Sequence, residues 1–205
     1  MTDLEEKAGI LLEFISAIEP LKTVTRHSWC SNGRPESVAE HSWRMAVMAL
    51  LLEDEFPDID VNKIVAMSLI HDLGEIAGDI PAFKKTVDDD DDERAQFERL
   101  VDNLPEGLAT KLSALHCEFT DGSTAEARLA NALDKLEAVI QHNEADLSTW
   151  EAVEYELNMT YGQDQTDRFP MLKTMRRLAK AQSIRKIQSA RPSIERNPAG
   201  ITGNL

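Results

Sequence analysis

The sequence predicts an all-α protein, a single-domain helical bundle of about six to eight helices. Apolar residues recur at intervals of three and four positions through most of the chain, which is the period of an amphipathic helix. Several of these stretches begin with a helix-capping pattern, and none shows the sustained alternation expected of half-buried strands. With 205 residues, the chain is long enough for one sizeable core.

Capping residues mark the starts of the expected helices. Three stretches begin with a Ser/Thr-x-x-Glu capping box, namely Thr2 to Glu5, Ser37 to Glu40 and Ser123 to Glu126. Asp60 provides another N-cap, and Pro105 suits the first turn of a helix. A loop is expected over residues 21–36. Helices are expected before Pro20 and over residues 38–56, 61–73, 97–104, 105–119, 123–140, 148–158 and 170–189.

Charge and composition limit the partners that the chain can have. The sequence holds 37 Asp and Glu against 22 Lys and Arg, so nucleic acid polymers and membrane surfaces are not expected to bind. No apolar run approaches the roughly 20 residues that span a bilayer, and the polar start MTDLEEK is unlike a signal peptide. Cys30 and Cys117 form no disulfide or metal pattern, so a cytoplasmic location is expected.

Two histidines and two aspartates are expected to lie in the core. His41 and His71 each share a helix face with apolar residues. Asp72 follows His71 directly, and Asp134 lies within an apolar-rich helix. Taken singly, each has a plainer explanation as a satisfied core histidine or a capping aspartate. Together, two imidazoles and two carboxylates from three helices suit Mn, Co, Fe, Zn or Ni and leave positions open for water and substrate.

The order and context of these residues resemble the HD-domain metal-dependent phosphohydrolase superfamily. The resemblance rests on the string EHS around His41, on His71-Asp72, and on the string ALDKL around Asp134. The string HDLGEIAGDIP that begins at His71, and the string RPESVAEH that ends at His41, are similar to the 5′-deoxynucleotidase branch of that superfamily. The match covers residues 10–145.

The resemblance implies a bound divalent cation, whose identity among Mn, Co, Fe, Ni, Zn and Mg stays open. The implied ligands are His41, His71, Asp72 and Asp134. Some relatives hold a second cation, so the resemblance is compatible with a site for one metal ion or for two. The positions that match this second cation are Glu75, Asp79 and the Ile80 carbonyl.

The resemblance also implies catalytic or supporting roles for Glu75 and Asp79. Glu75 lies four residues after His71 and shares its face if the helix persists, where a carboxylate can orient or deprotonate a metal-bound water. Asp79 follows Gly78 in a turn and can reach the sugar 3′-hydroxyl or the attacking water. The residues expected to contact the substrate are Arg26, Trp29, Asp72, Asp79, Ile80 and Asp134.

A basic loop supplies the phosphate-binding group that an acidic chain otherwise lacks. In relatives an Arg and a nearby Trp of this loop hold the phosphate, which implies that Arg26 binds and stabilises the phosphoryl group. Trp29 is the candidate aromatic residue. It stands three residues after Arg26, a spacing that departs from some relatives, so an anchoring role within the loop is the alternative.

The predicted function is hydrolysis of (deoxy)nucleoside 5′-monophosphates to nucleoside and phosphate by a metal-bound water. One alternative is an iron oxygenase on the same helical scaffold, which would need His116 or His142 as further ligands. Another is a non-catalytic nucleotide- or metal-binding protein. His116 and His142 are interpreted as non-ligands, and the acidic run over residues 88–93 as a solvated face.

A single phosphohydrolase domain is expected over residues 1–190, acting on small-molecule nucleotides. Its core covers residues 10–145, and C-terminal helices cover residues 148–190. Residues 191–205 are expected to form a flexible tail. Amphipathic helices near both ends, together with the resemblance, favour a homodimer.

Overall fold

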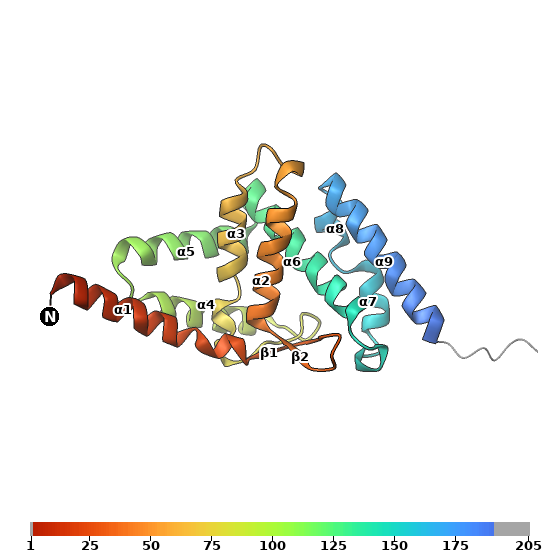
Figure 1. Ribbon diagram of the computed structural model, residues 1–205, viewed down its shortest axis with the longest axis horizontal. Coiled ribbons are helices and arrows are strands. Elements are labelled where there is room, and N and C mark those ends of the chain that lie inside the picture. Colours follow the sequence, from red (N-terminus) through yellow and green to blue (C-terminus); the bar gives the residue numbers. More distant parts are fainter. Residues whose placement is uncertain (1, 191–205) are drawn as a thin grey trace, which may run out of the picture.

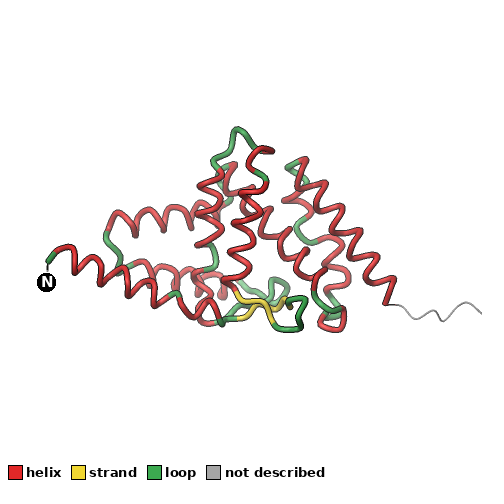
Figure 2. The backbone as a smooth tube through the Cα atoms, in the orientation of Figure 1, coloured by secondary structure: helices red, strands yellow, loops and turns green. Residues whose placement is uncertain are grey.

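Helices dominate the computed structural model, which describes residues 2–190 (Figures 1 and 2). The all-α class predicted from the sequence is confirmed. The α-helices are α1 (Asp3–Ala17), α2 (Val38–Leu51), α3 (Val61–Ile70), α4 (Val87–Val101), α5 (Glu106–Asp121), α6 (Ala125–Glu144), α7 (Glu154–Thr160), α8 (Gln163–Thr166) and α9 (Pro170–Ala190). Short 3₁₀ helices are η1 (Glu19–Lys22), η2 (Glu53–Glu55), η3 (Leu73–Ala77) and η4 (Leu147–Thr149). The predicted tail, residues 191–205, lies outside the described residues.

Helix α6 is the centre of the packing. Figure 1 shows it between the α2–α3 pair and the C-terminal helices α8 and α9. Its buried face includes Leu129, Leu133 and Leu136, which pack with apolar residues of α2, α3 and α9. A second apolar cluster is formed around Phe97 and Val101 of α4 and includes residues of α1. Side chains on α6 can therefore meet groups from several other elements at one point.

Two of the three predicted capping boxes are present, and the third is wrong. Thr2 and Ser37 each accept a hydrogen bond from the third helical residue, whose Glu side chain bonds back to the cap. The N-cap of α6 is Thr124 rather than Ser123. An unpredicted box at Thr86 opens α4, so the acidic run forms the first turns of that helix, where the helix dipole favours negative charge.

The expected loop over residues 21–36 contains a short β-hairpin, so this prediction was wrong. Strand β1 (Thr25–Trp29) pairs antiparallel with β2 (Pro35–Ser37), with an irregular register between its ends. Strands of five and three residues with mostly polar side chains are too short to show the alternation used to predict strands. Because β2 leads directly into α2, the hairpin lies at the N-terminal end of that helix (Figure 1).

Several predicted helices end or begin elsewhere. The helix predicted over residues 38–56 ends at Leu51, and the one predicted over residues 97–104 spans Val87–Val101. The helix capped by Asp60 ends at Ile70 instead of residue 73, and the chain continues in η3. Gly74 permits this path, because a Cβ on it would lie 2.3 Å from the backbone oxygen of Glu93 on α4. The helix expected over residues 148–158 is replaced by η4 and by α7, which starts at Glu154.

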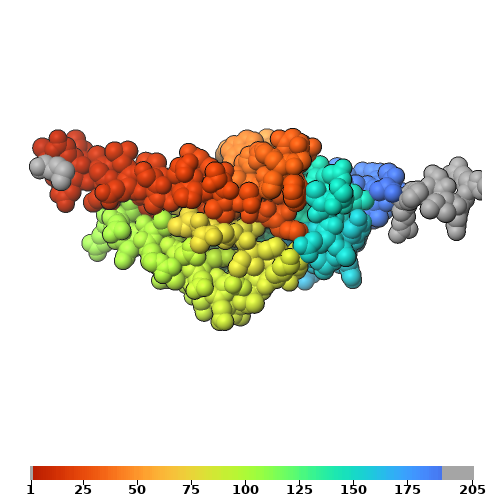
Figure 3. Space-filling view, turned by 90° about the horizontal axis from the view of Figure 1, so that it is seen from below, coloured from red at the N-terminus to blue at the C-terminus, as the bar shows by residue number. Residues whose placement is uncertain are grey.

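The segment after η3 crosses one face of the molecule. In Figure 3 it appears in yellow and yellow-green and meets the teal residues around α7. Lys84 of this segment donates a hydrogen bond of 3.0 Å to Glu151, an exposed contact with the residues just before α7. No helix within residues 2–190 is both long and apolar enough to cross a bilayer.

Candidate metal centre and its cavity

Three elements of the fold bring the predicted ligands together. His41 comes from α2, His71 and Asp72 from the two-residue link between α3 and η3, and Asp134 from α6. His41 Nε2 lies 3.1 Å from Asp134 Oδ1, and His71 Nε2 lies 3.1 Å from Asp72 Oδ2. One ligand atom from each of His41, His71 and Asp134 lies within 4.8 Å of the others, which is close enough for these atoms to share one ion. Asp72 lies outside this group of three, with its Oδ2 3.9 Å from His41 Nε2.

The histidine tautomers are set by groups behind the cluster. The Nδ1 of His71 donates to the carbonyl oxygen of Ser68 at 2.9 Å, and the Nδ1 of His41 donates to the Glu137 carboxylate. Both Nε2 atoms are buried, and neither makes a hydrogen bond of good geometry among the described residues. Two buried nitrogen lone pairs beside two carboxylates fit a divalent transition-metal ion.

The electrostatics of the cluster also favour a cation. Burial opposes the charged form of His41, yet the carboxylates of Glu137 and Asp134 raise its pKa to about 10. A cation that binds Nε2 would take the place of this proton. Burial likewise opposes the charge on Asp72, but His71, His41 and Arg26 hold the pKa of this carboxyl below its usual range. The site therefore has a negative potential that stabilises positive charge.

The cluster forms one end of a cavity of about 280 Å³. The predicted site residues that line it are Arg26, Asp72, Glu75, Asp79, Ile80 and Asp134. Trp29 does not line this cavity; instead its backbone oxygen accepts a hydrogen bond of 2.5 Å from Gln141. The structure thus brings together all the predicted polar side chains of the site but not the Trp29 ring.

Glu75 reaches the cavity by a route other than the predicted one. The expectation that it shares a helix face with His71 was wrong, because α3 ends at Ile70 and Glu75 belongs to η3. It is nevertheless buried and lines the cavity. Burial, together with the nearby Asp72 and Asp79 carboxylates, raises the pKa of Glu75 to about 9.

Asp79 links the turn after η3 to the hairpin. Gly78 has φ of 142°, which a residue with a side chain rarely adopts, and this turns the chain back toward β1. The Asp79 carboxylate accepts a hydrogen bond of 3.3 Å from the backbone N–H of His27. One Asp79 oxygen is therefore committed to holding the cavity wall in place.

Arg26 is the guanidinium at the acidic end of the cavity. From β1 it donates a hydrogen bond of 3.2 Å to Asp72, and its Nε lies 3.6 Å from Glu36. Arg34, the other arginine of the basic loop, pairs with Glu40 at the surface and does not line the cavity. Arg26 is thus the arginine positioned to meet a phosphate beside the predicted ligands.

Several residues of the cavity were not predicted from the sequence. At the end away from the metal cluster, Glu154 Oε1 lies 3.1 Å from His27 Nε2 and 3.3 Å from His142 Nε2. Further lining residues include Lys135, Phe83, Val139, Leu157, Asn158 and Tyr161. Lys135 could have been predicted as a site residue, because it follows Asp134 directly in the sequence. No sequence pattern indicated the α7 residues, because only the tertiary fold brings them to the site.

His116 and His142 do not belong to the group of proposed metal ligands. The His116 ring stacks on Phe97 with 3.9 Å between centroids, which occupies it in the apolar cluster under α4. His142 lines the cavity beside Glu154. Within residues 2–190, neither belongs to a group of atoms close enough to share an ion.

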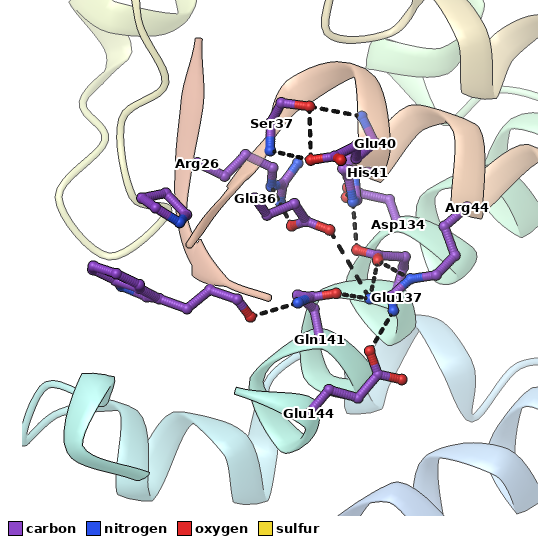
Figure 4. Close-up of polar contacts among 12 residues, drawn as sticks. Arg26, Glu36, Ser37, Glu40, His41, Arg44, Asp134, Glu137, Gln141 and Glu144 are labelled. Atoms are coloured by element: carbon purple, nitrogen blue, oxygen red, sulfur yellow. Dashed lines mark hydrogen bonds and ion pairs between the residues drawn. The ribbon is translucent and has the colours of Figure 1, made fainter. Parts of the chain in front are cut away.

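A second group of potential ligands, Glu36, His41 and Glu137, lies beside the first. Figure 4 shows that arginines already occupy it. Arg44 donates a hydrogen bond of 2.6 Å to Glu137 and lies 4.0 Å from Glu36, which also faces Arg26. Cationic side chains also pair with the first group, through Arg26 on Asp72 and Lys135 on Asp134. The first group is nevertheless the better site for a cation, because it alone offers two histidine Nε2 atoms without a hydrogen-bond partner among the described residues.

Comparisons with known proteins agree with this geometry. A family model described as an HD domain matches residues 18–176, which is most of the chain. The 5′-deoxynucleotidase HDDC2 of Homo sapiens is 34% identical over 142 residues, covering 67% of this chain and 69% of that protein. The 5′-deoxynucleotidase hdd1 of Schizosaccharomyces pombe is 30% identical over 164 residues, covering 70% of this chain and 81% of that protein.

The likeness extends to a solved structure. The crystal structure of a predicted metal-dependent phosphohydrolase from Magnetospirillum magnetotacticum superposes with a TM-score of 0.78 at 30% sequence identity. The superposition covers 90% of this chain and 96% of the other. Similarity in sequence and in fold therefore converges on the same class of protein.

Proposed function

This chain belongs to the HD-domain family, and from that premise we propose that it is a divalent-metal-dependent phosphohydrolase of (deoxy)nucleoside 5′-monophosphates. One observation supports the proposal above the others. Two buried histidine Nε2 atoms and two aspartates meet at one end of a cavity that also holds an arginine and a buried glutamate. This is the set of groups that hydrolysis of a phosphate ester requires.

The proposed ligands of the cation are His41, His71, Asp72 and Asp134, with Glu75 and Asp79 available to a second ion. When bound, the cation supplies Lewis acidity toward the phosphate and the attacking water. The candidate cations are Mn, Co, Fe, Ni, Zn and Mg. The mixed nitrogen and oxygen donor set favours a transition metal over Ca.

The protein's own groups orient the phosphate and handle protons. The Arg26 guanidinium, now held by Asp72, offers further N–H donors to phosphate oxygens and stabilises charge that develops during bond cleavage. Glu75 has one carboxylate oxygen, Oε2, with no hydrogen-bond partner among the described residues. Its raised pKa keeps the proton on Glu75 near neutral pH, and a cation bound beside it would lower that pKa and favour the carboxylate. In that form Glu75 is the proposed acceptor for the proton of the attacking water.

The remainder of the cavity suits a nucleoside. Phe83, Val139 and Leu157 give apolar walls, while Asn158 and Tyr161 add polar groups. Binding sites of this kind combine apolar surfaces with a few hydrogen-bonding groups. We propose that the phosphate lies at the Arg26 end and the nucleoside extends toward α7.

The oxygenase and sensor alternatives have less support. An iron oxygenase would need further histidine ligands, which His116 and His142 do not provide within the described residues. A non-catalytic binding protein has no need of a buried glutamate beside the ligands, whereas a hydrolase does.

A homodimer in the cytoplasm is proposed as well. Large apolar side chains are exposed on α1, α2 and α3, and they include Leu12, Ile15, Trp43 and Leu69. Such side chains favour association with another surface. Sedimentation equilibrium would test the dimer, and a single species of monomer mass would contradict it.

Phosphate release from a panel of deoxy- and ribonucleoside monophosphates tests the function. The protein is stripped of metal and resupplied with one cation at a time. Asp72→Ala removes a proposed ligand, and Asp58→Ala, at an exposed position, is the matched control. We expect release that depends on the cation, persists in the control and is lost in Asp72→Ala. Absence of release with every cation would contradict the monophosphatase assignment.

A further inference from the structure

Glu137 is a fully buried carboxylate that the proposed reaction does not use. It lies on α6, three residues after Asp134 and so on the same side of the helix. Burying a carboxylate is costly unless it is paired. Both of its oxygens are paired: Oε2 accepts from His41 Nδ1, and Oε1 accepts from Arg44 Nε at 2.6 Å (Figure 4).

The contact with His41 determines how that ring faces the metal cluster. Because Nδ1 donates to Glu137, the lone pair of the imidazole is on Nε2, which lies 3.1 Å from Asp134 Oδ1. Glu137 and Asp134 therefore hold the two nitrogens of one ring from a single helix. The direction of the Nε2 lone pair is set by α6 rather than by α2 alone.

Arg44 in turn holds Glu137 and extends the network. It lies on α2 three residues after His41, and besides Glu137 it contacts Gln141 and, at 2.6 Å, Glu144. Gln141 donates to the backbone oxygen of Trp29 in β1, the strand that carries Arg26. A continuous chain of contacts thus joins His41 to the hairpin.

We infer that Glu137, held by Arg44, is a positioning residue that presents His41 to the metal, and that Gln141 links this pair to the hairpin bearing Arg26. The inference rests on the proposed metal site. If the buried ion pair had a purely structural role, removal of one partner would lower the stability and leave the metal affinity of the folded protein unchanged. A partner that orients a metal ligand instead changes the affinity for the metal, by about 10- to 100-fold.

Metal affinity, measured without substrate, is the direct test. Glu137→Gln keeps the size of the side chain but removes its charge, and competition with a chromogenic chelator gives the affinity for Mn or Zn alone. We expect about 10- to 100-fold weaker binding. Glu144→Gln is the matched control, since it makes the same change on the same helix to another partner of Arg44 that does not touch His41. It should bind within about twofold of the unsubstituted protein.

An affinity of Glu137→Gln equal to that of the unsubstituted protein overturns the inference. So does an equal loss in Glu144→Gln, because the effect would then belong to Arg44 in general. Circular dichroism of the metal-free variants checks that they are folded. If Glu137→Gln does not fold, Arg44→Lys is the second test, because lysine keeps the positive charge but lacks the several N–H donors of the guanidinium group. Unchanged metal affinity in Arg44→Lys would also overturn the inference.

The link to the hairpin has its own readout. Gln141→Glu removes the donor to Trp29 but keeps a side-chain oxygen that accepts from Arg44, so Glu137 stays in contact with His41 and Arg44. Loss of one hydrogen bond should raise KM by about 2- to 10-fold through displacement of Arg26, with metal affinity unchanged. An unchanged KM contradicts this part. Because metal affinity is measured without turnover, the main test stands even if the enzyme's substrate is not a nucleotide.

Discussion

The two sides of the cavity are built in different ways. On the α2–α6 side, His41 and Asp134 lie inside regular helices, and the carboxylate behind them has both oxygens paired. On the other side, Glu75 lies on a 3₁₀ turn ahead of a glycine with positive φ, and its Oε2 has no hydrogen-bond partner among the described residues. Ligands of a metal must stay in place, whereas a group that accepts a proton must be free to change its bonding.

His41→Ala should have the largest effect, because it removes a ligand from the rigid side. Loss of the imidazole should abolish tight binding of the cation and with it several kcal/mol of charge stabilisation, so activity should fall by at least about a thousandfold. Metal content after desalting and the phosphate-release rate would be measured together. A variant that retained one bound ion per chain would show that the α2 side is not the ligand side.

Glu75→Gln should sharpen the difference between the two sides. The amide cannot take a proton, so the rate should fall by about a hundredfold or more. Metal content should stay the same, since the four proposed ligands are intact. If the metal were lost along with activity, Glu75 would itself be a ligand and the two sides would share one role.

Arg26→Ala and Arg34→Ala compare two arginines of the same hairpin region. Only Arg26 lines the cavity, and a charged hydrogen bond to phosphate is worth enough to raise KM by about 10- to 100-fold. Arg34 pairs with Glu40 at the surface, so its removal should leave KM unchanged. Steady-state kinetics on both variants checks this, and equal changes would mean that the loop acts only through its overall charge.

Gly74→Ala should affect stability rather than chemistry. The added methyl group would meet the Glu93 backbone at 2.3 Å, and such overpacking costs about 1–3 kcal/mol. Gly107→Ala in α5 is the control, since its Cβ meets no atom within 4 Å among the described residues. It should stabilise the protein by about 0.5–1 kcal/mol. Urea unfolding gives both values, and equal stability of the two variants would contradict the tight contact between η3 and α4.

The burial of two proposed ligands, His41 and Asp134, was predictable from the sequence, because both lie on helices whose apolar period is clear. The period places His41 and Asp134 toward the core, and burial of both is observed. The break after Ile70 was not predictable, since it depends on a backbone contact between η3 and α4 that no local pattern records. Glu137 was missed because an acid on a helix is usually solvated, and only its meeting with His41 and Arg44 explains its burial.

Helix α6 also sets the dimensions of the cavity. Asp134 at one end and His142 near the other both line it, and eight residues of helix separate them by about 12 Å along the axis. An inserted residue between them would rotate every later side chain by about 100° and turn His142 away from the cavity. We therefore expect point substitutions in α6 to be tolerated more readily than any change in its length.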